Sequence, residues 1–396
     1  MKKVAIVNVF FPPQTIGGAT RVVSDNIDTI VQKYSDEVEI VGFCTQADCR
    51  KEYDVEVYPY KGFRVYRVNS HFRENMDWHA KDENFYEIFK NFLEFEKPDI
   101  VHFHCVQRMT ASVVEAARDV GIPYFVTAHD AWWISDYQFL TDQNDRVYPE
   151  GHIDRFDDRE YPEGITPTQS IQRERYLKGL LKSASAVLHV SESFKAIYEK
   201  NGVLNNKVIK NGVSSTVEWR MKDTACTKNV VLGHIGGMSA HKGFDVFKRA
   251  LELFDGEGLE AIIVDHSKEA SYVAREKIGS VPVKYVGRQS QDKIVDLYTS
   301  MDVLFAPSLW PESFGLVTRE ANACGCWVVA SDLGGIGEDI KNSSGFVVSA
   351  SVNDLLFVIN EISRNMKRYK QNSDCCATAH TSESQVDSLV KEVYLR

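Results

Sequence analysis

The sequence predicts an α/β protein with two domains, each built on a parallel sheet, and three observations predict it. The chain has 396 residues, enough for two or three domains at roughly 100–200 residues each. Short apolar runs alternate with helix-length segments, which is typical of parallel sheets covered by helices. The second half repeats the order of apolar runs and helix-length segments found in the first. Gly17-Gly18 and Gly236-Gly237 follow the leading apolar run of each half.

The first half is expected to form a series of strands and helices that ends in a turn. The expected strands cover residues 4–10, 38–44, 63–68, 100–104, 124–128 and 186–190. The expected helices cover residues 20–34, 111–120, 170–183 and 192–201. They are recognised by apolar residues at helical spacing and by end signals, such as Gly121 and Pro123 after the second helix. The Asn211-Gly212 turn marks the end of a first domain covering residues 1–212.

The second half is expected to form a domain covering residues 213–380, followed by a terminal helix over 381–396. Its expected strands cover residues 230–235, 259–264, 283–286, 303–306, 327–330 and 346–348. Its expected helices cover residues 242–254, 294–300 and 314–324. The tail has apolar residues on one helical face, so it needs a partner surface, and the first domain is one candidate.

Composition and charge limit the classes of partner. Hydrophobic residues make up 43% and charged residues 26% of the chain, which excludes disorder as the dominant state. The net charge of -10 makes the chain a poor candidate for nonspecific nucleic-acid binding, which depends on cations. A basic helix face at Arg173, Arg175, Lys178 and Lys182 leaves peripheral membrane contact open, although a solvated surface explains it better.

The cysteines and the N-terminus indicate a cytoplasmic protein. The eight cysteines show no pairing or metal-ligand spacing, so neither a disulfide framework nor a structural metal is expected. No apolar run approaches membrane-spanning length. The apolar segment at residues 4–11 is broken by Asn8 and ended by Pro12-Pro13, so it is expected to be a buried strand rather than a signal peptide.

A polar and aromatic segment at residues 130–164 interrupts the alternation. It holds ten acidic and three basic residues, and long loops of this kind inside a compact domain are usually functional or disordered. Its interleaved aromatic residues favour an ordered segment.

The strongest chemical signal is the segment 307–320, which follows an expected strand and opens an expected helix. Ligands of open α/β sheets bind at the carboxyl ends of strands, and the N–H groups of a helix start attract anions. Gly315 lets the backbone approach a phosphate. Glu312 and Glu320 stand eight residues apart, so one carboxylate can serve a sugar and the other a ribose. Helix capping alone is the other explanation of Glu312.

This segment resembles the E-x7-E segment of retaining glycosyltransferases with the GT-B fold, of the glycosyltransferase family 4 type. The resemblance continues through residues 320–331 (EANACGCWVVAS) and 334–338 (GGIGE), with Trp327 where proline is usual. It extends over nearly the whole chain. It implies two Rossmann-like βαβ domains facing a cleft, with the nucleotide-sugar bound by the C-terminal domain and the acceptor by the N-terminal one.

The resemblance implies a role for each matching donor-site residue. Glu312 is similar to the carboxylate beneath the donor sugar, and Glu320 to the ribose-binding one. The diphosphate contacts correspond to Ser313, Phe314, Gly315 and Leu316, to Gly17 and Gly18, and to the loop 236–243 with Lys242 as the cation. Gly237 stands where the family usually has arginine. Either His241, Arg288 or another basic group replaces that arginine, or the leaving diphosphate is held less strongly.

The resemblance also places histidines of the N-terminal domain near the sugars. Residues 127–130 (TAHD) resemble the family's H-D segment, which makes His129 a candidate contact of the donor sugar. Residues 98–104 (PDIVHFH) resemble its D-x-V-H-x-H strand, and His104 is a weaker candidate for acceptor contact than for a place in the core.

The acidic and aromatic segment 130–164 begins within the H-D segment, so the resemblance places its start beside the sugars. Aromatic faces stack on sugars, and carboxylates bind sugar hydroxyls. We therefore expect Asp130, Trp132, Trp133 and Tyr137 to contact the acceptor sugar; a packed lid without sugar contact is the other interpretation.

The resemblance therefore implies transfer, with retention, from a nucleoside-diphosphate sugar to a hydroxyl of a glycan or lipid-linked glycan, in bacterial surface-polysaccharide synthesis. No D-x-D triplet is present, so neither a metal nor another cofactor is expected. Two alternatives are a nucleotide-sugar hydrolase or epimerase of the same fold and a catalytically silent partner that binds a glycan or nucleotide. The sequence leaves the donor, the acceptor and the oligomeric state open.

Overall fold

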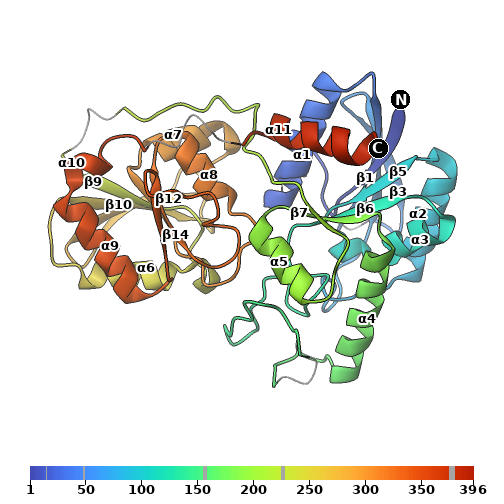
Figure 1. The fold of residues 1–396 in the computed structure, drawn as a ribbon, viewed down its shortest axis with the longest axis horizontal. Coiled ribbons are helices and arrows are strands. Elements are labelled where there is room, and N and C mark those ends of the chain that lie inside the picture. The colour runs from blue at the N-terminus through green and yellow to red at the C-terminus, as the bar shows by residue number, and fades with distance from the viewer. Residues whose placement is uncertain (15, 48–49, 155–157, 224–227, 374–379) are drawn as a thin grey trace. The chain divides into compact units, whose positions relative to one another are not determined.

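The computed structural model describes residues 1–14, 16–47, 50–154, 158–223, 228–373 and 380–396. The chain divides into two compact units. Unit 1 comprises residues 1–143, 150–214 and 380–396, and unit 2 comprises residues 144–149 and 215–379. Figure 1 shows that helices flank the strands of each unit. Each unit is therefore an α/β layer structure with its own sheet.

The sheet of unit 1 is parallel except at one edge. Its strand order is β3-β4-β2-β1-β5-β6-β7-β8, and only the pairing of β3 with β4 is antiparallel. Its strands are β1 (Lys2–Val7), β2 (Val38–Gln46), β3 (Val55–Tyr60), β4 (Phe63–Asn69), β5 (Ile100–Phe103), β6 (Tyr124–Ala128), β7 (Ala186–His189) and β8 (Asn206–Val208). Its helices are α1 (Gly18–Lys33), α2 (Glu83–Glu96), α3 (Ser112–Val120), α4 (Pro167–Ser183), α5 (Glu192–Lys200) and α11 (Ser382–Leu389), which continues as a π-helical turn, Val390–Tyr394.

The sheet of unit 2 has the same plan. Its strand order is β11-β12-β10-β9-β13-β14-β15, with an antiparallel edge pair of β11 and β12. Its strands are β9 (Val230–His234), β10 (Leu259–Asp265), β11 (Val273–Ile278), β12 (Val281–Gly287), β13 (Val303–Ala306), β14 (Trp327–Ser331) and β15 (Gly345–Val348). Its helices are α6 (Phe244–Leu253), α7 (Ile294–Thr299), α8 (Leu316–Ala323), α9 (Val352–Arg364) and α10 (Met366–Tyr369).

Alternating side chains of the central strands build the core on both faces of each sheet. In β1, Ala5 and Val7 join one apolar cluster while Val4 and Ile6 join another. Neighbouring side chains of a strand point to opposite faces, so a continuous apolar run is what a doubly covered strand requires. In β13, Phe305 and its neighbours divide in the same way between two clusters of unit 2.

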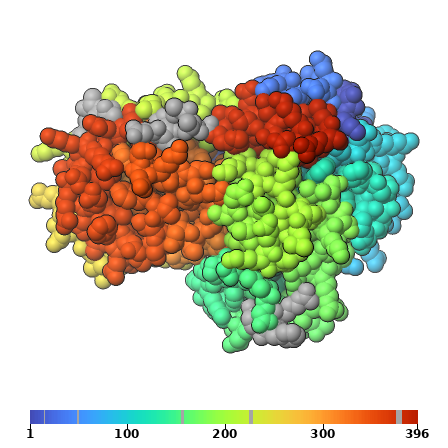
Figure 2. Space-filling view, in the orientation of Figure 1, coloured from blue at the N-terminus to red at the C-terminus, as the bar shows by residue number. Residues whose placement is uncertain are grey.

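The C-terminal residues pack on the first helix of unit 1. Val386, Leu389, Val390 and Val393 are buried in a cluster that also contains β1 and α1 side chains. Figure 2 shows the red C-terminal residues against the blue α1. The amphipathic tail thus has its partner surface on unit 1.

Candidate functional site

Glu312, the predicted donor-sugar carboxylate, lies in unit 2 in the loop between β13 and α8. Lys242 Nζ lies 2.8 Å from Glu312 Oε1, and the Ser308 hydroxyl donates to the same oxygen. The Gly335 N–H donates to the Glu312 carbonyl at 2.7 Å. Glu312 is only 7% exposed, so a partner cation rather than bulk water stabilises its charge. The structure therefore joins Glu312 and Lys242 in one ion pair.

Lys242 ends the one-turn 3₁₀ helix Ala240–Lys242, which follows the Gly236-Gly237 loop. Its ammonium lies 5.3 Å from the centroid of the Trp310 ring, a cation–π contact. Sequence reasoning missed Trp310 and Ser308 as members of the site. Their closeness in sequence to Glu312 was the available signal, because both lie within four residues of it.

The backbone at the start of α8 is shaped by Gly315. This residue has φ +80°, and a Cβ added to it would lie 2.5 Å from Ile336 Cγ1. Any other residue would therefore be strained and would collide with the neighbouring loop. The first N–H groups of α8, the predicted diphosphate contacts around Phe314 and Leu316, have no partners within the helix by geometry. Such a helix start favours an anion.

Arg319 is a second residue that sequence reasoning missed. Its buried guanidinium donates to the carbonyl oxygens of Gly335 at 2.8 Å and Ile336 at 3.1 Å, and it also donates to the carbonyl of Phe314. It pairs with Asp339 at 2.8 Å. Arg319 therefore ties the start of α8 to the glycine loop after β14. An arginine within a short buried helix was the signal that could have indicated it.

Glu320, the predicted ribose ligand, is buried in α8. The Tyr298 hydroxyl donates to Glu320 Oε2 at 2.6 Å. The residue is 1% exposed. Binding of a ribose to Glu320 would therefore require movement that uncovers its carboxylate.

In unit 1, the predicted glycine loop lies at the carboxyl end of β1. Gly17 caps α1, and Gly17 and Gly18 are exposed. The loop is anchored by the buried Asn8, whose amide donates to the carbonyl of Phe10 at 2.6 Å and to the Thr20 hydroxyl at 3.2 Å. The exposed glycines start a helix whose first amides are accessible, as an anion site needs.

Three histidines come together at the carboxyl ends of β5 and β6. His104 Nδ1 lies 2.9 Å from His129 Nε2, and the two rings are stacked. The ring of His102 lies 4.2 Å from that of His104, and its nitrogens bond to the hydroxyls of Tyr394 at 2.6 Å and Thr127 at 2.7 Å. Burial lowers the pKa of His129 to about 4 and also lowers that of His104. The His104–His129 pair is therefore neutral at pH 7, with one ring donating to the other.

Asp130 is a buried carboxyl group at the start of the acidic and aromatic loop. It accepts hydrogen bonds from the side-chain amides of Gln107 at 3.0 Å and Gln138 at 2.7 Å, and from the Trp132 N–H at 3.0 Å. Its own carbonyl accepts from the Tyr198 hydroxyl at 2.6 Å. Asp130 thus fixes the first turn of the loop; residues 155–157 of this loop lie outside the described residues.

Two aromatic residues that were expected to stack on an acceptor sugar are core residues instead. Trp132 and Trp133 are 2% and 3% exposed and belong to the main apolar cluster of unit 1. The Arg173 guanidinium lies 4.8 Å from the centroid of the Trp132 ring and donates to the Trp132 carbonyl at 3.0 Å. The rings therefore offer no face to a sugar. Tyr137, which is half-buried, remains in the acceptor hypothesis.

The same contacts correct the expected basic face of α4. Arg173 is 6% exposed, and it also donates to the carbonyls of Trp78 and Ser135. Lys178 forms an ion pair with Glu174 at 2.6 Å. Arg173 is thus a buried residue that holds the start of the acidic and aromatic loop in place. The positive charge on the surface of α4 is therefore smaller than the sequence indicated.

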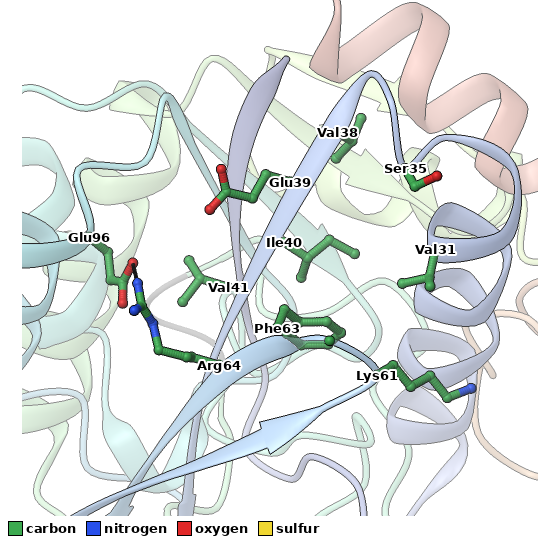
Figure 3. A pocket seen from close by; sticks show the side chains of 11 residues that line it. Val31, Ser35, Val38, Glu39, Ile40, Val41, Lys61, Phe63, Arg64 and Glu96 are labelled. Atoms are coloured by element: carbon green, nitrogen blue, oxygen red, sulfur yellow. Dashed lines mark hydrogen bonds and ion pairs between the residues drawn. The ribbon is translucent and has the colours of Figure 1, made fainter.

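A cavity of about 400 Å³ opens in unit 1 near the amino ends of β2 and β4. Val41, Phe63 and the ion-paired Arg64 and Glu96 line part of it (Figure 3). The candidate glycines and histidines follow the carboxyl ends of β1, β5 and β6 instead. The cavity is therefore separate from the predicted site residues of this unit.

Among the described residues, no three His, Cys, Asp or Glu side chains are grouped so that they could hold a metal ion. The structure describes Cys44, Cys105, Cys324 and Cys326, and none of these four forms a disulfide. The remaining four (Cys49, Cys226, Cys375 and Cys376) lie outside the described residues. No helix in the described part of the chain combines the length and apolar character needed to span a membrane.

Comparison with known proteins gives relatives of moderate similarity. The chain is 33% identical over 127 residues to a D-inositol 3-phosphate glycosyltransferase of Rhodococcus jostii, covering 29% of this chain and only 28% of that protein. An uncharacterized 42.6 kDa protein of the Klebsiella pneumoniae cps region is 23% identical over 359 residues, covering 85% and 86% of the two chains. The crystal structure of Anabaena HepE with UDP and glucose superimposes with a TM-score of 0.66 at 17% identity, covering 99% of each chain. This last likeness shows the fold.

Two family models divide the chain between them. The glycosyl transferase 4-like domain matches residues 17–212, and the glycosyl transferases group 1 model matches residues 217–379. The matched segments correspond to the main parts of unit 1 and unit 2. The second contains the sheet of unit 2, and the first contains the sheet of unit 1 apart from β1. From the fold and from both family matches, the chain belongs to the GT-B glycosyltransferases.

Proposed function

We propose that this glycosyltransferase retains the anomeric configuration of the sugar that it moves from a nucleoside diphosphate to a hydroxyl of a glycan or lipid-linked glycan. The observation that carries the proposal is the Glu312–Lys242 ion pair beside the start of α8. Lys242 and the helix-start amides supply positive charge for a leaving diphosphate. Glu312 supplies negative charge for the electron-poor sugar.

The environment of Glu312 favours an electrostatic or orienting role over that of a nucleophile. Its Oε1 already accepts hydrogen bonds from Lys242 and Ser308, so this oxygen is engaged by neighbouring groups and is less available to attack the sugar. In the mechanism that we propose, the acceptor hydroxyl attacks on the face that the diphosphate leaves. The leaving phosphate oxygen takes the acceptor proton, so no protein base is required.

Residues of unit 1 are assigned to the sugars. His129 is half-buried at the end of β6 and is oriented by His104, so a hydrogen bond to a donor hydroxyl is its proposed role. Tyr137 is the residue of the acidic and aromatic loop that is proposed to contact the acceptor. Asp130 is proposed to hold that loop in place through its hydrogen bonds. The glycines Gly17 and Gly18 complete the proposed diphosphate contacts.

The biological setting is proposed from two comparisons. The Klebsiella relative is a protein of a cps region, which favours surface-polysaccharide synthesis, with transfer at the inner face of the cytoplasmic membrane. The Anabaena structure contains UDP and glucose, so UDP-sugars are the first donors to test. The following experiment identifies the donor and the acceptor.

The test uses purified full-length protein with UDP-, GDP- and ADP-sugars. A donor is expected to raise the thermal unfolding midpoint, because a ligand that binds only the folded state stabilises it. With glycan or lipid-linked acceptors, NMR of the product should show the anomeric configuration of the donor. Glu312→Gln is expected to lower kcat by roughly 10²–10³-fold, as loss of one electrostatic group commonly does. His71→Gln removes an exposed histidine of unit 1 and serves as the control.

Other outcomes separate the alternatives. A product with inverted configuration would contradict the retaining mechanism. Donor breakdown at the same rate without an acceptor would favour a hydrolase. Full glycan synthesis in cells that carry only Glu312→Ala would favour a catalytically silent binding partner.

A further inference from the structure

Three parallel strands of unit 2 bring a histidine and an arginine beside the glycine loop. In the pairing of β9 with β10, His234 lies opposite Ile263, and the same register continued by three residues places His266 beside Gly237. In the pairing of β10 with β12, Asp265 lies opposite Gly287, so His266 and Arg288 leave neighbouring strand ends. The register alone therefore groups the loop with His266 and Arg288.

Each glycine of the Gly236-Gly237 loop has the side chain of another residue beside it. A Cβ on Gly236 would lie 3.5 Å from Lys242 Cβ, and a Cβ on Gly237 would lie 3.2 Å from His266 Nδ1. His266 thus occupies the space into which a side chain at position 237 would project. Both His266 and Arg288 are exposed, so a ligand can reach them. His234 holds the loop from below, with Nε2 3.0 Å from the Gly237 carbonyl oxygen.

The charge balance of the loop calls for a cation besides Lys242. The Lys242 ammonium also pairs with Glu312 at 2.8 Å, so Glu312 offsets part of the positive charge that Lys242 offers to a diphosphate. Asp265, the acidic neighbour of His266, accepts from the N–H and hydroxyl of Ser267 at 2.9 and 2.7 Å. The positive charge at these strand ends therefore comes from Arg288 and Lys268, and from His266 when it is protonated.

We propose that His266 binds the diphosphate of the donor together with Arg288, and that it does so as the imidazolium ion. The proposal rests on the donor site proposed above and adds a residue and a pH dependence to it. An imidazolium donates charge-assisted hydrogen bonds to phosphate oxygens, which are stronger than neutral ones.

The surroundings of His266 favour its neutral form when no ligand is bound. The pKa of His266 is lowered by partial burial of its ring and by the charges of Arg288 and Lys242, against opposing contributions from the Ile235 backbone and Asp265. A bound diphosphate reverses this balance because its negative charge favours the protonated ring. Donor binding is therefore coupled to proton uptake, and donor affinity increases as the pH falls toward the pKa of the unliganded ring.

The experiment measures binding of the UDP-, GDP- or ADP-sugar that stabilises the wild-type protein most. A nucleotide sugar is used because its pyrophosphate has no ionisation near neutrality, so the pH dependence reports on the protein. Calorimetry at pH 5.5, 7 and 8.5 compares wild type with His266→Gln, His266→Lys and the control His71→Gln. Two buffers of different ionisation enthalpy measure the proton uptake.

The wild-type protein is expected to bind roughly 5- to 10-fold more tightly than His266→Gln at pH 5.5 and about equally at pH 8.5. His266→Lys should bind tightly at every pH without proton uptake, and His71→Gln should match wild type. Equal affinity and proton uptake for wild type and His266→Gln would overturn the role of His266 while leaving the donor site intact. Absence of binding by any nucleotide sugar to the wild type would instead overturn the proposed function, and this inference with it.

Discussion

At the scale of single residues, Asp130 shows how the fold changes a carboxyl group. Burial raises the pKa of Asp130 to about 6, although the hydrogen bonds from Trp132, Gln138 and Gln107 oppose this effect. An aspartate in the unfolded chain titrates near 3.9. Between these values the folded protein holds a proton that the unfolded chain has released, so the stability of unit 1 depends on pH.

We expect this contribution to stability to decrease as the pH rises from about 4 to 7. Because the folded pKa lies above the unfolded one, the stabilisation is complete below the unfolded value and is lost as the pH rises through about 6. A difference of about two between the pKa values corresponds to ~3 kcal/mol. Asp130→Asn cannot titrate, so urea unfolding at pH 4, 5, 6 and 7 should show a wild-type advantage that shrinks with pH. A constant difference between the two proteins would contradict the assignment.

Sequence reasoning succeeded best for residues that belong to one local motif. Glu312 and Lys242 were both named from motifs, and the structure places them in contact at 2.8 Å. Trp132 could not be placed in the same way, because its partner Arg173 lies 41 residues later. His266 was missed because only the strand register brings it to Gly237. A contact fixed by tertiary packing leaves no local pattern in the sequence.

At the scale of elements, the buried strands were predictable and the exposed ones were not. The central strands are continuous apolar runs, as their double burial requires. The antiparallel edge strands β3 and β11 are largely exposed and alternate or lack apolar residues, so they gave no such signal. The helix predicted at residues 314–324 begins at Leu316, because the positive φ of Gly315 ends the preceding loop there.

Gly315→Ala is expected to cost more stability than the same change at a glycine with equal φ and open space. Gly315 and Gly121 have φ +80° and +81°, but a Cβ would meet Ile336 at 2.5 Å in the first case and nothing within 4 Å in the second. Gly121→Ala should cost about 1 kcal/mol from backbone strain, and Gly315→Ala ~1–3 kcal/mol more from overpacking. Thermal unfolding compares the two variants, and binding of a nucleotide sugar should weaken only in Gly315→Ala. Equal shifts of the unfolding midpoint would show that the contact with Ile336 relaxes at no cost.

At the scale of the whole molecule, chain order and structural order differ. The chain completes most of unit 1 by Ser214, forms unit 2 and returns to unit 1 with residues 380–396. The sequence predicted a terminal amphipathic helix with the first domain as a candidate partner, and the packing on unit 1 is confirmed. The sequence could not give the individual contacts of this segment. Its last tyrosine, Tyr394, bonds to His102 at 2.6 Å. The C-terminal residues therefore also help to hold the histidine cluster to which the predicted sugar contact His129 belongs.

Truncation of one buried side chain in the C-terminal segment 380–396 should therefore lower the stability of β1 and β5, which lie far from it in the sequence. Leu389 is 2% exposed and packs in the same cluster as Val4 of β1 and Ile100 of β5. Leu389→Ala is expected to destabilise unit 1 by ~2–5 kcal/mol, as for other buried leucines. Lys391→Ala, at an exposed ion-paired position on the same segment, should change stability by less than about 0.5 kcal/mol.

Hydrogen exchange of β1 and β5 amides measures the effect where it is expected. If the C-terminal segment is part of the unit 1 core, Leu389→Ala must speed exchange in both strands, because their most protected amides open only when that core opens. Protection that stays at the wild-type level in β1 and β5 would mean that the segment packs on a core that is already complete. In that case the return of the chain would matter for the position of Tyr394 and not for the stability of the sheet.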